Sequence, residues 1–165
     1  MVLKINRKEF EHVAGLYVYS TGKSPSKTIF KVGMSTNLFT RLRSYHTCYK
    51  DGYWIHNLVK IMDYPSVFSK LKPHQKKEIS SVVRKVERRV HTILKGDNPK
   101  KKNYQVGQLS SRTSEWFKVE NIETISEAIR RAYEEITGHR LKSGNTSKEK
   151  VAPRIFTDMD RIEFG

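Results

Sequence analysis

The sequence has little cysteine and no long apolar run. Cys48 is the single cysteine among 165 residues, so an intrachain disulfide and zinc-finger spacing are both excluded. No stretch approaches the roughly 20 apolar residues that a membrane-spanning helix needs. Residues 1–11 alternate charged with isolated apolar side chains, which is unlike a signal peptide. We therefore expect an intracellular protein, in the cytoplasm or nucleus of a host cell, without a membrane partner.

Acidic residues are scarce relative to basic ones. Lys and Arg number 32 against 17 Asp and Glu, which gives a formal net charge of +15. A surplus of this size is costly in self-repulsion unless a polyanion neutralises it. Nucleic acid is the first candidate partner, DNA before RNA. An acidic membrane surface and a merely basic surface are the alternatives.

Hydrophobic periodicity divides the chain into strands and helices. Residues 13–19 and 29–33 are rich in β-branched and aromatic side chains, and the turn residues Gly22 and Pro25 between them predict a β-hairpin. A helix capped by Thr36 or Asn37 follows. Further on we expect strands over residues 54–62 and 115–119 and helices over residues 74–94 and 122–137.

This order of elements predicts an α+β fold, with a small, mainly antiparallel sheet flanked by helices. The domain is expected over residues 1–138. Residues 139–165 are polar, basic and poor in apolar side chains over their first half, which is typical of a linker, and they are expected to form a basic C-terminal extension.

Several short motifs follow one another along the chain. The first strand holds Gly15-Leu16-Tyr17, and the second holds Phe30-Lys31-Val32-Gly33-Met34-Ser35. Arg41 and Tyr45 lie on the helix that follows, Glu87 and His91 on the long helix, and Glu115-Trp116-Phe117 on the last strand. Together these motifs resemble the GIY-YIG endonuclease superfamily, and they are most similar to its bacteriophage and large-virus DNA-binding branch.

The resemblance implies a metal-dependent endonuclease that binds DNA and hydrolyses phosphodiester bonds. It implies that Arg41 is the active-site arginine and that Glu87 holds one Mg²⁺ or Mn²⁺ ion. The expected catalytic residues are Tyr17, Arg41 and Glu87, with Lys31, Tyr45 and His91 in support.

These residue types suit the chemistry without the resemblance. A single carboxylate such as that of Glu87 can hold one divalent ion that keeps several waters. The planar fork of Arg41 matches the oxygens of a phosphate. The hydroxyl of Tyr17 can position a water. Taken one by one, however, Tyr17 also fits a strand aromatic, Glu87 a solvated helix residue and His91 a satisfied rim histidine.

One motif residue departs from the family pattern. Lys31 stands where nuclease members carry the second motif's tyrosine, so it indicates either a phosphate contact or a site kept for binding alone. Three functions therefore stay open: an endonuclease, a catalytically weak DNA-binding module of the same fold, and a basic RNA-binding or scaffold protein.

Tyr49, Tyr53, Trp54 and Tyr104 lie near basic stretches and are candidates for base stacking. The expected nucleic-acid contacts are Lys31, Arg41, Arg43, Arg84, Arg88, Lys100, Lys101 and Lys102.

Overall fold

A six-stranded sheet forms the centre of the molecule. The computed structural model describes residues 2–5, 7–49, 52–96, 116–143, 153–157, 159 and 161–164 of the chain. The strands of the sheet are β2 (Val13–Thr21), β3 (Ile29–Ser35), β4 (Tyr53–Asp63), β5 (Trp116–Lys118), β6 (Lys142–Ser143) and β7 (Arg154–Phe156). Their order is β5–β3–β2–β4–β7–β6, and every neighbouring pair is antiparallel except β6 and β7.

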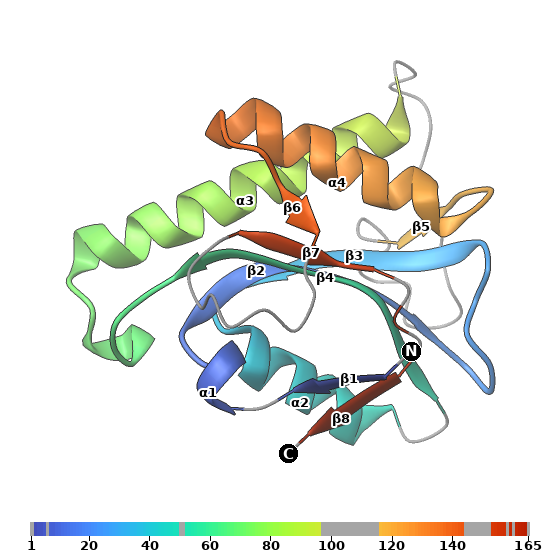
Figure 1. Cartoon of the computed structure of the whole chain (residues 1–165), viewed down its shortest axis with the longest axis horizontal. Coiled ribbons are helices and arrows are strands. Elements are labelled where there is room, and N and C mark those ends of the chain that lie inside the picture. Colours follow the sequence, from blue (N-terminus) through green and yellow to red (C-terminus); the bar gives the residue numbers. More distant parts are fainter. Residues whose placement is uncertain are drawn as a thin grey trace.

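Helices cover both faces of this sheet. On one face α3 (Pro73–Lys95) and α4 (Ile122–Thr137) lie side by side, and the other face carries α1 (Arg7–Phe10) and α2 (Leu38–Cys48) (Figure 1). The expected α+β fold, a mainly antiparallel sheet flanked by helices, is therefore confirmed. Within the described ranges, none of the helices combines the length and the apolar composition needed to cross a lipid bilayer.

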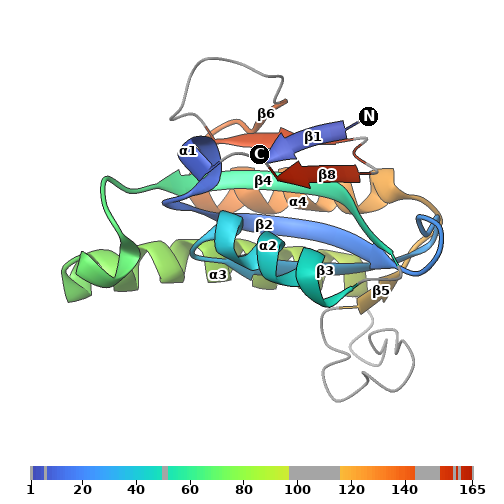
Figure 2. The same ribbon diagram turned by 90° about the horizontal axis from the view of Figure 1, so that it is seen from below.

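The two ends of the described chain meet on the α2 side of the sheet. There β1 (Val2–Ile5) and β8 (Arg161–Phe164) pair in parallel as a separate two-stranded sheet (Figure 2). A single 3-10 turn, η1 (Phe68–Lys70), lies between β4 and α3. β1, β8 and α1 are elements that the periodicity of the sequence does not reveal, because each has only four residues.

Local sequence explains where the main helices begin and end. The Asn37 side chain accepts a hydrogen bond from the backbone N of Thr40 at 3.1 Å, which caps α2 as expected. Pro73 occupies the first turn of α3, where its missing N–H has no helical partner in any case. Asn121 caps α4, which ends at Gly138 with a φ of 72°, a left-handed conformation that glycine adopts without strain.

Two short strands that follow residue 138, β6 and β7, belong to the main sheet. β7 pairs with β4 through the register Leu58 to Phe156 and Lys60 to Arg154. Leu141 and Ile155, each about 1% exposed, are part of the main core. Lys142–Ser143 and Arg154–Phe156, from the part expected as linker and tail, thus complete one edge of the sheet, with β7 next to β4.

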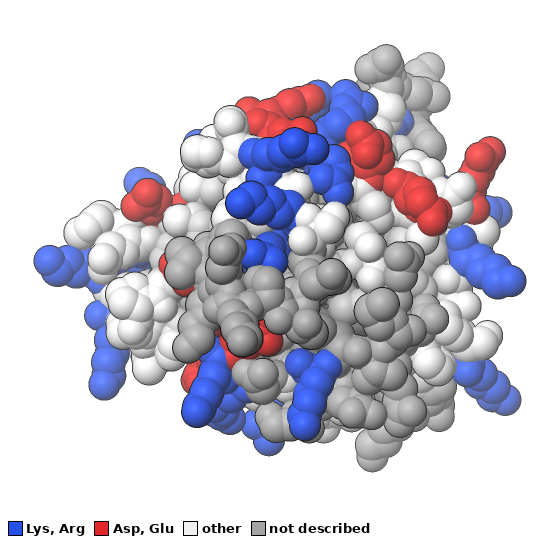
Figure 3. Space-filling model, viewed as in Figure 1, with Lys and Arg blue, Asp and Glu red and all other residues white. Residues whose placement is uncertain are grey.

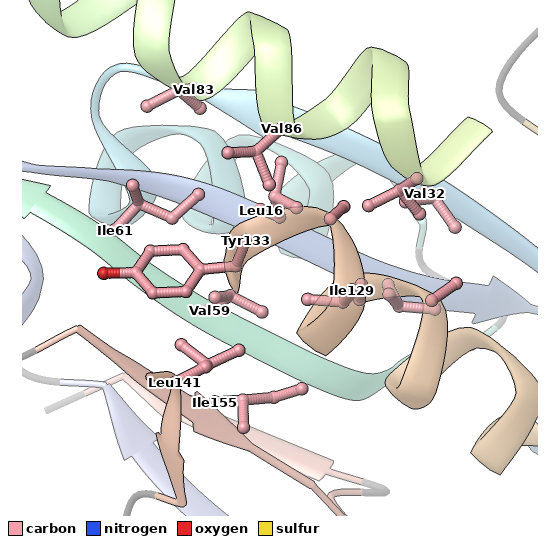
Figure 4. Close-up of a cluster of buried hydrophobic side chains, with 14 of the residues drawn as sticks. Leu16, Val32, Val59, Ile61, Val83, Val86, Ile129, Tyr133, Leu141 and Ile155 are labelled. Carbon is pink, nitrogen blue, oxygen red and sulfur yellow. The ribbon is translucent and has the colours of Figure 1, made fainter. Parts of the chain in front are cut away.

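The main hydrophobic core lies between the sheet and the pair α3 and α4. Val83 and Val86 of α3 and Ile129 of α4 point towards Leu16 and Val32 of the sheet (Figure 4). All five are fully buried. Since burying such a side chain contributes about 1.5–3 kcal/mol, this layer fixes α3 on the hairpin of β2 and β3.

We predict that Gly15→Ala lowers the free energy of unfolding by about 3 kcal/mol. A Cβ atom at Gly15 would lie 1.8 Å from the backbone O of Val59, and this carbonyl belongs to the neighbouring strand β4 and cannot swing away. Chemical denaturation of the variant gives the measurement. Arg43→Ala, at an exposed position of α2, is the control and should change the free energy little. An unchanged midpoint for Gly15→Ala would contradict the close packing of β2 on β4.

Candidate functional site

The α2 face of the β2–β3 hairpin holds two of the predicted site residues. Side chains alternate along a strand, so Tyr17 and Tyr19 of β2 point to the same face. The register places Gly33 opposite Tyr17 and Lys31 opposite Tyr19. The two strands therefore present Tyr17, Tyr19, Lys31 and Gly33 together beneath α2.

Gly33 makes room for the ring of Tyr17. A Cβ atom at Gly33 would lie 2.5 Å from the Tyr17 hydroxyl oxygen and 2.6 Å from Cζ of the same ring. The phenol consequently lies across the glycine of the neighbouring strand. The glycine of the second motif thus has a packing role, which is to let Tyr17 reach towards α2.

A short hydrogen-bonded turn aims α2 at this face. Ser35 Oγ, at the end of β3, donates to the backbone O of Asn37 at 2.9 Å and accepts from the backbone N of Asn37 at 3.0 Å. Leu38 and Leu42 of α2 are fully buried against the sheet. Arg41 is exposed, and it lies one turn before Tyr45 on the helix.

Four of the predicted residues meet at this point. The hydroxyl oxygens of Tyr17 and Tyr45 lie 3.1 Å apart and share a hydrogen bond. Lys31 Nζ lies 5.4 Å from the centre of the Tyr45 ring, and Arg41 Cζ lies 5.9 Å from the same centre. Both distances are within the range of cation–π attraction. A phenol pair flanked by two cations, one of them exposed, can hold a phosphate and a water next to each other.

Burial differs between the two phenols. Tyr17 is only 3% exposed, whereas Tyr45 is half-buried. A molecule from solvent therefore reaches Tyr45 and Arg41 before it reaches Tyr17.

A larger tyrosine cluster continues from this pair. The Tyr19 ring lies within 5.9 Å of the Tyr45, Tyr49 and Tyr53 rings, measured between centroids. Burial raises the pKa of Tyr19 and Tyr53 well above the ordinary value, so both stay neutral at working pH. Tyr19 is not among the site residues predicted from the sequence. Two sequence patterns could have indicated the cluster: Tyr17 and Tyr19 are two residues apart on a strand, and Tyr45 and Tyr49 are four residues apart at the end of a helix.

α3 reaches the hairpin from the opposite face. His91 Nε2 donates a hydrogen bond to the backbone O of Val32 at 3.0 Å, and its ring lies 5.0 Å from that of Phe117, between centroids. Val32 stands between Lys31 and Gly33 in β3. His91 therefore fixes α3 to the strand that carries Lys31, and its Nε2 is occupied by this bond.

Glu87 lies one turn before His91 on α3. Its side chain is half-buried, and the carboxylate oxygen Oε2 is shielded from solvent. Among the described residues, no three His, Cys, Asp or Glu side chains group closely enough to hold a metal ion. The helix that carries Glu87, α3, covers the opposite face of the sheet from α2, which carries Arg41 and Tyr45 (Figure 1).

The other predicted nucleic-acid contacts are spread over the surface. Arg43 of α2 and Arg84 and Arg88 of α3 are exposed, on opposite faces of the sheet, and Lys100, Lys101 and Lys102 lie outside the described residues. Over α4 and β6, where Arg131 and Lys142 are exposed, basic side chains lie next to acidic ones (Figure 3). Positive charge thus covers more than one face, which favours the approach of a polyanion from several directions.

We predict that Gly33→Ala displaces the Tyr17 ring and breaks its hydrogen bond to Tyr45, because the added methyl group occupies the space of the Tyr17 hydroxyl. The loss of stability should be smaller than for Gly15→Ala, since a side chain can move where a backbone carbonyl cannot. A crystal structure of the variant is the measurement. Finding the two hydroxyls still 3.1 Å apart would show that Gly33 does not govern the position of Tyr17.

Comparison with known protein families bears on this arrangement. The T5orf172 domain, a phage-associated domain, matches residues 14–133, the region that runs from β2 to α4. Comparison with curated proteins gives no match. Comparison with solved structures gives none either. The matched region is more than half of the chain and includes every element that contributes to the site, so this chain belongs to the T5orf172 domain family.

Proposed function

We propose that this protein is a metal-dependent endonuclease of the GIY-YIG type, which binds DNA and hydrolyses phosphodiester bonds. One observation carries the proposal: Tyr17, Lys31, Arg41 and Tyr45, from three separate elements, meet in one group on the α2 face of the sheet. The T5orf172 domain match supports a nucleic-acid-related function, and the net charge of +15 supports a polyanionic substrate.

Arg41 and Lys31 would bind the scissile phosphate. Hydrolysis places extra negative charge on the nonbridging phosphoryl oxygens, and fixed cations stabilise that charge most when they are already in position. Arg41 is exposed and offers a planar pair of donors. Lys31 is half-buried and adds a point charge from the floor of the site.

The two phenols would position the attacking water. Tyr45 is the more exposed of the pair, so its hydroxyl would accept a hydrogen bond from the water, and Tyr17 would hold Tyr45 in place. Tyr45 comes from α2, so it supplies a phenol on this face although Lys31 stands at the motif's tyrosine position. This arrangement favours retained activity despite the altered motif.

Glu87 would hold the divalent ion, Mg²⁺ or Mn²⁺. Such an ion, when bound, lowers the pKa of a bound water and neutralises charge on the phosphate. The half-buried carboxylate is a hard oxygen donor, as these ions require. His91 would act as a positioning residue, because it fixes α3 on β3 one turn from Glu87.

A second function is favoured by Lys31 itself. Its ammonium lies 5.6 Å from the Tyr19 ring centre and 5.4 Å from the Tyr45 ring centre, so it covers the tyrosine cluster. A site of this kind binds phosphate without needing to cut it. The alternative proposal is therefore a DNA-binding module in which the same residues bind a strand and cleavage is weak or absent.

We predict that Glu87→Gln reduces Mg²⁺-dependent cleavage at least about 100-fold, because the neutral amide holds a divalent ion poorly. DNA affinity measured in EDTA should stay within about 3-fold of the wild-type value, since Arg41 and Lys31 remain. Glu78→Gln is the matched control, being an exposed glutamate on the same helix, and it should cut at the normal rate. Cleavage at the wild-type rate by Glu87→Gln would exclude Glu87 as the metal ligand. Wild-type protein that binds DNA but never nicks it with Mg²⁺ or Mn²⁺ would favour the binding module.

We also predict that Lys31→Met weakens DNA binding and lowers the slope of log affinity against log salt by about one, since each neutralised phosphate contributes about 0.9 to that slope. A salt titration by fluorescence anisotropy measures both quantities. Lys70→Met, which removes an exposed lysine of η1 outside the group, is the control for net charge. If both variants lower the slope equally, Lys31 contributes only to the general field and not to a phosphate contact.

A further inference from the structure

The tyrosine cluster extends beyond the residues that the proposed cleavage uses. Arg41 and Tyr45 lie four residues apart on α2, and Tyr49, which caps the C-terminal end of the helix, follows after another four, so the three lie on one side of it. At 1.5 Å per residue the stripe is about 12 Å long. This matches the span of about three to four stacked nucleotides at 3.4 Å each.

The cluster has a buried floor and a more exposed rim. Tyr19 is 0% exposed and Tyr53 is 9% exposed, whereas Tyr45 and Tyr49 are half-buried. The rings of Tyr49 and Tyr53 are nearly parallel, at 13° with centroids 6.1 Å apart. The floor therefore supports the rim rings from beneath and leaves part of each open to solvent.

Fold stability alone does not explain the hydroxyls of this cluster. Tyr53 Oη is buried and has no hydrogen-bond partner among the described residues, and such a group is a net cost that phenylalanine would avoid. The hydroxyls of Tyr19 and Tyr49 are 3.5 Å apart, a long contact that satisfies the Tyr49 hydroxyl only weakly. The Tyr49 hydroxyl at the rim thus retains hydrogen-bonding capacity for a ligand, while its ring is held by those of Tyr19, Tyr45 and Tyr53.

The charges around the rim suit one class of ligand. Lys31 Nζ and Arg41 Cζ lie 5.4 and 5.9 Å from the Tyr45 ring centre, so both cations lie at the Tyr45 end of the stripe, and the Tyr49 ring follows beyond them. A nucleic-acid strand likewise places planar bases next to a phosphate. Bases inside a duplex are stacked on each other and offer only their edges, so aromatic rings stack readily only on unpaired bases.

We infer that Tyr45 and Tyr49 form a stacking platform for unpaired bases of single-stranded DNA, next to the phosphate bound by Arg41 and Lys31. The substrate is therefore DNA with a single-stranded stretch at the site, rather than a fully paired duplex. This inference rests on the proposed function for the role of Arg41 and Lys31. The other aromatic residues expected to stack on bases differ from Tyr49. Tyr53 belongs to the buried floor of the cluster, and Trp54 donates a hydrogen bond from Nε1 to the backbone O of Gly22 at 3.0 Å. Tyr104 lies outside the described residues.

The test compares Tyr49→Leu with Tyr49→Phe, because Tyr49 lies outside the cleavage machinery. Leucine keeps apolar contact but cannot stack, and phenylalanine keeps the ring. Affinity is measured in EDTA by fluorescence anisotropy, for a single-stranded oligonucleotide of mixed sequence and for the same sequence as a duplex. We expect wild type to bind the single strand more tightly, Tyr49→Leu to lose about 10-fold or more of that affinity, and Tyr49→Phe to match wild type. Duplex affinity should be the same for all three proteins.

Three results would overturn the inference: a preference of wild type for duplex, an equal loss of single-strand and duplex affinity in Tyr49→Leu, or tighter binding of an RNA strand of the same sequence. Thermal unfolding of each variant shows whether leucine has changed the fold, and Tyr49→Phe keeps the comparison valid if it has. Because EDTA prevents cleavage, the platform and the endonuclease proposal fail separately. If the protein prefers single strands but does not cut in Mg²⁺, only the endonuclease proposal is rejected. If it cuts duplex DNA and shows no preference for single strands, only the stacking platform is rejected.

Discussion

The alternation of side chains along β3 is the constraint on which the site depends. Lys31 and Gly33 point to the α2 face, and Val32 between them packs in the opposite core, where its carbonyl accepts the hydrogen bond from His91. One strand therefore positions a cation, leaves space for the Tyr17 ring and receives the helix that carries Glu87. A shift of β3 by one residue would reverse every one of these relations.

Most elements of the fold follow from local sequence. The hairpin, the capped helix α2 and the amphipathic helices α3 and α4 each carry their own periodicity and end signals, and the structure confirms them. β7 could not be predicted, because a three-residue strand has almost no local pattern and its partner β4 lies far away along the chain. The same holds for β1 and β8, which come from the two ends of the sequence and form a sheet only with each other.

The candidate site was predictable in composition but not in its contacts. The order of the motifs predicted Tyr17, Lys31, Arg41 and Tyr45 as site residues, and these four lie together in the structure. Sequence spacing could not show that His91 bonds to a backbone carbonyl of β3, since that partner has no side-chain signature. Nor could it show that Tyr19 is the centre of an aromatic cluster, because the rings around it come from α2 and β4.

Burial divides the tyrosines of the cluster into two groups with different roles. Removing a phenol from water disfavours its charged form, and the pKa of Tyr19 and of Tyr53 is raised for this reason. These two rings are consequently unsuited to proton transfer and serve as support. Solvent reaches the half-buried rings of Tyr45, on α2, and of Tyr49, which caps the C-terminal end of that helix. The cations Lys31 and Arg41 flank Tyr45, so under the proposed function the phosphate of a strand would be held at this end of the stripe and its bases would extend towards Tyr49. The proposed cleavage and strand recognition would thereby depend on one helix, whose position is set by the buried leucines and the Ser35–Asn37 turn.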